Sequence, residues 1–298
     1  MKTTIEWLGT ATWRLTIGDM VVFLDTYMDR VPAAPPVGLA SAEVTKADFI
    51  LMGHAHFDHI GGADVIALNT GAKVIGSTES CRVLRERGVP DAQLLASQGG
   101  ERHALGPGIT VRIFPSIHSC TWILTDAGAG DEESGHTGLT QNERAQQPGL
   151  GQRIFGLAGS PESQVIFDHI RSQAGSLHDG GALVFLIETP DGRIFFQDTS
   201  GSWTGVLDDL SADIAVLAAA GRANVNGEPI QGSMAQFIAA ETKTLGARTV
   251  LIGHHDNWMP PVTPPTFDMD AVRAEIGRQA PAAVLVEPRY REIVTLFE

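Results

Sequence analysis

Four apolar segments of strand length each lead into a histidine or an aspartate. The first, Phe49–Met52, is followed one residue later by the sequence HAHFDH at positions 54–59. The other three end close to His118, Asp198 and His254. Loops that follow strands are where a rigid scaffold commonly presents its chemically active side chains. We therefore expect a chain built around sheets, with one polar site assembled from several strand ends.

Strand and helix patterns alternate along most of the chain. Three strand patterns occupy residues 4–26, and the last two are separated by Gly18-Asp19, a typical two-residue hairpin turn. The apolar run 49–52 is typical of a central strand in a covered sheet. Further strand patterns lie at 72–78, 109–116, 182–189, 193–199, 212–221, 248–255, 282–287 and 291–297, and helix patterns at 78–88, 161–175, 234–246 and 268–280. By themselves these patterns predict only an α/β or α+β fold, with helices outside mostly apolar strands.

The regular alternation stops between about residues 121 and 181. This segment holds glycine-rich and polar clusters around one helix pattern, and it carries no strand pattern. Long irregular segments of this kind often shape a substrate pocket. We expect residues 1–298 to form a single domain, with an insertion at about 121–181 that covers the active site.

Composition narrows the class of protein and of partner. Of the 298 residues, 43% are hydrophobic and 19% are charged, as in ordinary globular domains. The formal net charge of −14 argues against a nucleic-acid partner, and no apolar run is long enough for a transmembrane segment. The N-terminus lacks a secretory signal pattern, and Cys81 and Cys120 cannot form a disulfide framework. We expect a cytoplasmic protein that acts on a small molecule.

The first histidine cluster has the spacing of a metal site. His54 and His56 are two residues apart, so on a turn leaving a strand both imidazoles can converge on one cation. Asp58 and His59 follow directly and can face a second cation. The alternative for this cluster is a solvated polar loop without a ligand.

Three downstream residues complete the predicted pair of metal sites. His118 would join His54 and His56, His254 would join Asp58 and His59, and the two oxygens of Asp198 would bridge both ions. Two neighbouring ions can make water nucleophilic near neutral pH. Taken alone, His118 could be a satisfied histidine at a strand end, and Asp198 could cap a turn. His255 competes with His254, which we favour because it directly follows the strand.

These residues carry a resemblance to a known family. HAHFDH matches the HxHxDH motif of the metallo-β-lactamase superfamily, and His118, Asp198 and His254 follow in that family's order. The opening, residues 5–26, resembles the branch that contains L-ascorbate-6-phosphate lactonase and the phospholipase D acting on N-acyl ethanolamine lipids. Asp25 matches the first-motif aspartate of the family.

The resemblance implies a fold and a reaction. The expected fold is a four-layer αββα sandwich with the two-metal site between the sheets. The expected enzyme is a metal-dependent hydrolase whose metal-activated hydroxide attacks an ester or lactone C–O bond of a small molecule, with Asp58 and Asp198 as catalytic residues. Phosphodiester cleavage and an iron-dependent oxidoreductase remain alternatives. Histidine and carboxylate ligands without cysteine suit two zinc ions best and also suit manganese or iron. Asp25 is expected to hold the second ring nitrogen of a ligand histidine, or the loop backbone.

Other residues near the predicted ligands have weaker assignments. Tyr27, Trp203 and Trp258 each follow a predicted site residue by a few positions and could wall a pocket or pack in the core, with Tyr27 able to donate to an oxyanion. Cys120 is expected to be a buried, inert thiol. The remaining histidines have no partner spacing and are expected to be exposed or on helix surfaces: His103, His136, His169 and His178.

Overall fold

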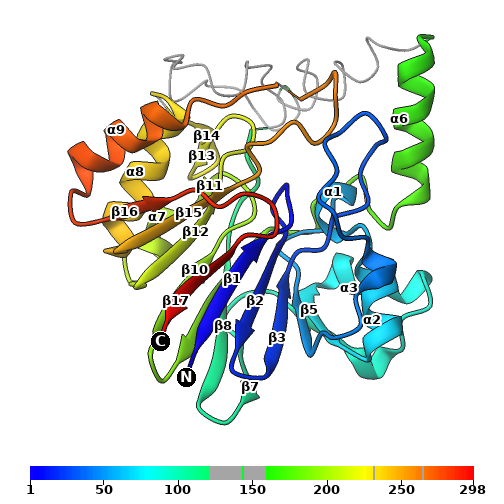
Figure 1. The fold of residues 1–298 in the computed structure, drawn as a ribbon, viewed down its shortest axis with the longest axis horizontal. Coiled ribbons are helices and arrows are strands. Elements are labelled where there is room, and N and C mark those ends of the chain that lie inside the picture. The colour runs from blue at the N-terminus through cyan, green and yellow to red at the C-terminus, as the bar shows by residue number, and fades with distance from the viewer. Residues whose placement is uncertain (121–142, 144–158, 231, 264) are drawn as a thin grey trace.

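The structure consists of two seven-stranded sheets packed face to face, with helices outside both. It is a computed structural model that describes the chain except for residues 121–142, 144–158, 231 and 264. Figure 1 shows α8 (Met234–Leu245) and α9 (Met269–Gln279) beyond one sheet, and α2 (Ala63–Thr70) and α3 (Thr78–Glu86) beyond the other. The predicted four-layer arrangement is confirmed.

The first sheet contains most of the N-terminal third of the chain. Its order is β17-β1-β2-β3-β4-β5-β6, antiparallel from β17 to β3 and parallel from β3 to β6. The strands are β1 (Thr3–Trp7), β2 (Trp13–Ile17), β3 (Met20–Leu24), β4 (Phe49–Leu51), β5 (Lys73–Ser77), β6 (Leu94–Ser97) and β17 (Ile293–Phe297). Ile17 pairs with Met20 across the predicted turn, and Gly18 has the left-handed φ of 58° that such a turn needs.

The second sheet has the order β16-β15-β12-β10-β9-β8-β7. Its strands are β7 (Arg102–Gly106), β8 (Ile109–Pro115), β9 (Leu183–Thr189), β10 (Gly192–Phe196), β12 (Ile214–Ala218), β15 (Thr249–Gly253) and β16 (Val284–Val286). A small third sheet joins β11 (Gly201–Ser202), β13 (Asn224–Val225) and β14 (Glu228–Pro229). β10, β12 and β15 run parallel, so their carboxyl ends meet at one edge.

The two sheets share a central core. Fully buried side chains from both meet in it, among them Leu15 of β2 and Phe185 of β9. Burying each such side chain stabilises the fold by about 1.5 to 3 kcal/mol. Two further cores lie under the outer helices, one joining α2 and α3 to the first sheet and one joining α8 and α9 to the second.

Capping residues define where the outer helices begin and end. Ser77 accepts a hydrogen bond from the Ser80 amide at the start of α3. Ser233 and Gln236 form a capping box at the start of α8, and Gly246 ends that helix in a left-handed conformation. These signals are local in sequence, and both helices coincide with the helix patterns at 78–88 and 234–246.

Some elements were missed or lie outside the described residues. The strands β6 and β7 and the helices α1 (Phe57–Ile60), α2 and α7 (Thr204–Leu207) were not predicted, and two 3₁₀ turns lie at Ser41–Glu43 and Asp91–Gln93. The helix predicted between residues 161 and 175 is α6 (Pro161–Ser172), whereas most of the predicted insertion lies outside the described residues. Among the described helices, none is both long and apolar enough to cross a membrane.

Candidate metal centre

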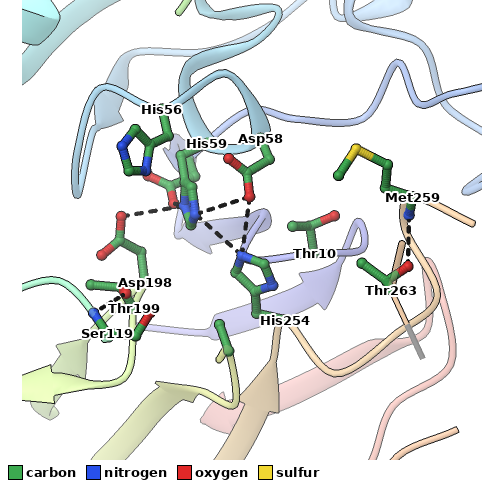
Figure 2. A network of polar contacts seen from close by, with 12 residues as sticks. Thr10, His56, Asp58, His59, Ser119, Asp198, Thr199, His254, Met259 and Thr263 are labelled. Atoms are coloured by element: carbon green, nitrogen blue, oxygen red, sulfur yellow. Dashed lines mark hydrogen bonds and ion pairs between the residues drawn. The ribbon is translucent and has the colours of Figure 1, made fainter. Parts of the chain in front are cut away.

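The seven predicted metal ligands lie together, although they span positions 54 to 254. Their nitrogen and oxygen atoms form three overlapping groups, in each of which all ligand atoms lie within 4.8 Å of one another. The groups are His54, His56 and His118; His54, His59 and Asp198; and Asp58, His59 and His254. Figure 2 shows His59 and Asp58 facing Asp198 and His254 from across the site.

Each ligand is placed by the end of a strand, as the sequence indicated. Residues 54–59 follow β4, where His56 is the N-cap of the single-turn helix α1. His118 follows β8, Asp198 follows β10 and His254 follows β15. The short helix turns Asp58 and His59 back toward the sheet edge, so one sequence motif contributes to all three groups.

Asp198 lies between the outer two groups. Its Oδ2 is 2.6 Å from His54 Nδ1 and 3.3 Å from His59 Nδ1. Its Oδ1 is fully buried and has no hydrogen-bond partner among the described residues. A buried carboxylate oxygen without a partner is costly unless a cation or a donor satisfies it. This unsatisfied oxygen is the first observation that fits a cation at the site.

Burial favours the neutral form of three of the imidazoles. Desolvation, together with neighbouring histidines, lowers the pKa of His54 and of His59 well below the ordinary value, and it lowers the pKa of His56 to about 4. Although burial raises the pKa of Asp58, its electrostatic interaction with His59 and its hydrogen bond with His254 hold that pKa below its usual range. The site therefore offers neutral imidazole lone pairs and a charged carboxylate, the donors that zinc, manganese and iron bind.

The spacing of the nitrogens also fits a metal. His54 Nε2 lies 3.1 Å from His56 Nδ1, and His59 Nε2 lies 3.2 Å from His254 Nε2. Two ligand nitrogens that each bind a tetrahedral zinc ion at about 2.0 to 2.1 Å are about 3.3 Å apart. The nitrogens thus stand at metal-ligand separation, and the residues present fit the expected pair of ions.

Comparisons with known proteins found sequence similarity over part of the chain. Residues 21–135 match the family described as the beta-lactamase superfamily domain. A UPF0173 metal-dependent hydrolase from Pyrobaculum islandicum is 32% identical over 115 residues, which are 39% of this chain and 50% of that protein. The chain spans about half the length of the curated relatives it matches.

Solved structures resemble the chain over its whole length. The metallo hydrolase Igni18 from Ignicoccus hospitalis has a TM-score of 0.63 and 17% identity, covering 100% of this chain and 99% of that chain. The metallo-beta-lactamase fold protein YhfI from Bacillus subtilis has a TM-score of 0.56 and 12% identity, covering 99% of this chain and 100% of that chain. This chain has the metallo-β-lactamase fold.

Asp25 supports the centre of this metallo-β-lactamase fold through two contacts. Its Oδ2 is 2.7 Å from His59 Nδ1, and its Oδ1 accepts a hydrogen bond from the Gly53 amide at 3.0 Å. The sequence predicted one contact or the other, and both are present. Glycine is required at position 53 because a Cβ there would lie 1.9 Å from Asp198 Oδ2.

The structure separates the two candidate histidines that follow β15. His254 belongs to a ligand group, with its Nε2 3.4 Å from Asp58 Oδ2. His255 instead stacks on Trp7, with ring centroids 4.7 Å apart, and belongs to none of the groups found among the described residues. The choice of His254 agrees with this arrangement.

An aromatic cluster borders the metal centre. Tyr27 is fully buried, packs edge-on against Phe57 and Trp258, and has its hydroxyl 2.8 Å from His169 Nε2. Trp258 also packs edge-on against His254, with ring centroids 5.5 Å apart. The contact between the Tyr27 hydroxyl and His169 thus joins α6 to the residues beside the site.

Sequence reasoning missed the role of His169. It was expected to be a helix-surface histidine, yet it is half-buried and bonded to Tyr27. Ile166, three positions earlier on α6, is buried, so this face of the helix points inward. Nothing in the sequence linked positions 27 and 169.

The other flagged residues lie apart from the ligands. Trp203 is 36% exposed and donates its indole N–H to the Ser116 carbonyl at 3.0 Å. Cys120 is buried, as expected, and belongs to no ligand group of the described chain. His103 is 3.5 Å from the Ser97 hydroxyl, and His178 is exposed, whereas His136 lies outside the described residues.

Proposed function

We propose that this protein is a metal-dependent hydrolase with two divalent cations. The observation that carries the proposal is the set of three overlapping ligand groups. Asp198 belongs to the middle group, and its buried Oδ1 has no hydrogen-bond partner among the described residues. The curated relative from Pyrobaculum islandicum, named a metal-dependent hydrolase, supports the same class of reaction.

Each ion has its own set of ligands in this proposal. His54, His56 and His118 would hold the first, and Asp58, His59 and His254 the second, with Asp198 shared. Two such cations, when bound, polarise a substrate carbonyl or phosphoryl oxygen and lower the pKa of water. Zinc suits the donor set best, and manganese and iron are the metals to test beside it.

Asp58 and Asp198 have different tasks in the proposed reaction. Asp58 is charged and its side chain is 13% exposed, so its free oxygen can accept the proton of an attacking water and pass it to the leaving group. Asp198 is fully buried and has no such access. It would orient His54 and His59, whose ring nitrogens it contacts, and would contribute a negative charge shared by the two cations.

The substrate that we propose is a small molecule with an ester or lactone C–O bond. The resemblance of residues 5–26 to a lactonase branch supports this choice. The aromatic side chains of Phe57 and Trp258, next to Asp58 and His254, would favour an apolar group beside the bond that is cleaved. Cleavage of a small or lipid-like phosphodiester is the second candidate, from the same resemblance.

We further propose that residues 1–298 act as one metallo-β-lactamase-like domain whose α6 lies beside the active site. The contact between His169 and Tyr27 supports this, because Tyr27 packs against Trp258 and Trp258 against His254.

The test is a substrate panel combined with metal analysis. Protein purified without added metal is analysed for zinc, manganese and iron, and is then assayed on lactones, carboxylic esters and small chromogenic phosphodiesters. We expect about two ions per chain and turnover of a lactone or ester that is lost in His56→Ala and in Asp198→Ala. Turnover retained by either variant would contradict the proposed site, and turnover of the diesters alone would select the second candidate.

A further inference from the structure

A buried carboxylate two residues beyond His254 is not part of the metal-ligand groups. Asp256 Oδ2 accepts hydrogen bonds from Arg30 Nη2 at 2.5 Å and from the Tyr290 hydroxyl at 2.6 Å. Both oxygens also lie within 3.3 Å of the Thr10 amide. The side chains of Arg30 and Asp256 are only 3% and 8% exposed. Removing one partner of such a buried pair strongly destabilises the fold, because the remaining buried charge has no counter-charge.

This carboxylate ties together four distant segments of the chain. Thr10 follows β1, Arg30 follows β3, Asp256 follows β15 and Tyr290 precedes β17. Arg30 also donates to the Tyr290 hydroxyl at 3.1 Å, and its guanidinium lies over the Tyr290 ring. The network therefore joins the loop that carries His254 to segments beside three strands of the first sheet, β1, β3 and β17.

The network reaches His254 through the backbone of Thr10. The His254 amide donates to the Thr10 carbonyl at 2.6 Å. Both residues have left-handed backbones, with φ of 47° for Thr10 and 61° for His254. A non-glycine residue in this region is held there by its surroundings at a cost of about 1 to 3 kcal/mol. Here the Asp256 carboxylate holds the Thr10 amide, while the Thr10 carbonyl holds the His254 amide.

We propose that Asp256, paired with Arg30, is a positioning residue for the second cation. It holds Thr10 and His254 in their left-handed conformations, so that His254 Nε2 faces Asp58 and His59 at 3.4 and 3.2 Å. This inference rests on the two-ion centre of the proposed function, although not on the proposed substrate.

The position of the network predicts an unequal effect on the two ions. His54, His56 and His118 are carried by the loops after β4 and β8, which contribute none of the four segments joined by Asp256. Loss of the carboxylate should therefore weaken the second ion while leaving the first in place. If Asp256 only stabilised the fold, its loss would not weaken the binding of one ion more than that of the other.

The test is a calorimetric titration of the metal-free full chain with Zn²⁺. Asp256→Asn keeps the shape of the side chain and removes its charge, and Tyr290→Phe removes one donor while keeping the ion pair. Glu6→Gln is the matched control, because Glu6 is 5% exposed and accepts two hydrogen bonds from Arg14, at 2.8 and 2.7 Å, away from the metal centre. Thermal unfolding of all four proteins measures the purely structural effect.

We expect wild type and Glu6→Gln to bind two ions with the same affinities. Asp256→Asn should weaken the second ion by about tenfold or more, as loss of a group behind a metal ligand commonly does. Tyr290→Phe should weaken the binding of the second ion by about threefold. If Asp256→Asn does not fold, the result with Tyr290→Phe tests the inference instead.

The possible failures are distinguishable. Wild-type protein that binds fewer than two ions would overturn the two-ion centre and this inference with it. Two ions in wild type, with the second bound equally well by the folded variants, would overturn the inference alone. Equal weakening of both ions would also overturn it, since it would show a general loss of structure.

Discussion

Glu241 is a buried acid in the second half of α8, and its titration should make the stability of the protein depend on pH. The residue is 4% exposed, and its Oε2 has no hydrogen-bond partner among the described residues. Burial raises the pKa of the Glu241 carboxyl from 4.5 to about 8, although hydrogen bonds from Ser202 and Gln197 oppose the rise. The folded protein thus keeps this group neutral at a pH where the unfolded chain ionises it.

The size and sign of the effect follow from this difference in pKa. Each pKa unit corresponds to about 1.4 kcal/mol, so the interval from 4.5 to about 8 corresponds to about 5 kcal/mol. Because the folded-state pKa is raised, the stabilising contribution is complete below pH 4.5 and is lost as the pH rises toward 8. By pH 7 about 3 kcal/mol of it should already be lost.

The substitution Glu241→Gln isolates this contribution, because glutamine resembles the neutral acid and does not titrate. We expect wild type and variant to have similar free energies of unfolding near pH 5. The variant should be more stable by several kcal/mol at pH 9, approaching about 5 kcal/mol. Groups that titrate alike in both proteins, including the metal ligands, cancel in the comparison.

The measurement is urea unfolding followed by tryptophan fluorescence from pH 5 to pH 9, at one fixed metal concentration. Glu86→Gln is the control, because the Glu86 side chain is 65% exposed on α3 and its difference from wild type should not change with pH. If the difference between Glu241→Gln and wild type were the same at pH 5 and pH 9, the reasoning from burial would be refuted.

Three further predictions concern the metal centre and its supports. Gly53→Ala should reduce the metal content of the purified protein, because the added Cβ would displace the Asp198 carboxylate. The control is Gly277→Ala, which should keep both ions because its Cβ meets no atom within 4 Å. Equal metal contents of the two variants would refute the role given to Gly53. Chelation of the metal should lower the midpoint of thermal unfolding by several degrees, since a ligand that binds only the folded state stabilises it, and an unchanged midpoint would argue against bound ions. Tyr27→Phe should lower the free energy of unfolding by about 1 kcal/mol through loss of the bond to His169, and an equal stability in urea unfolding would show that this bond contributes nothing.

The elements that sequence predicted well are those with a local signal. The hairpin at Gly18-Asp19 and the helix pattern at 78–88 each depend on neighbouring residues, and both are present in the structure. The strand β7 was missed because its five residues, RHALG, lack the apolar alternation that marks the other strands. α2 was also missed, since no helix pattern was assigned to the eight residues that form it behind the histidine motif.

For the metal centre too, some properties follow from neighbouring residues and others from contacts between distant residues. The sequence alone determined which donors the chain carries, that six consecutive residues supply four of them, and that the other three follow strands. Spacing along the chain controls these properties, because a turn after a strand fixes which nearby side chains can converge.

Only the tertiary structure decided which distant groups meet. The contact of Tyr27 with His169 joins positions 142 residues apart, and the contact of Arg30 with Asp256 joins positions 226 residues apart. Likewise, His254 rather than His255 faces Asp58, because the left-handed backbone at His254 directs its ring into the site. Periodicity reports only the burial and local geometry of each segment, whereas these contacts depend on strand order and on how the two sheets pack together.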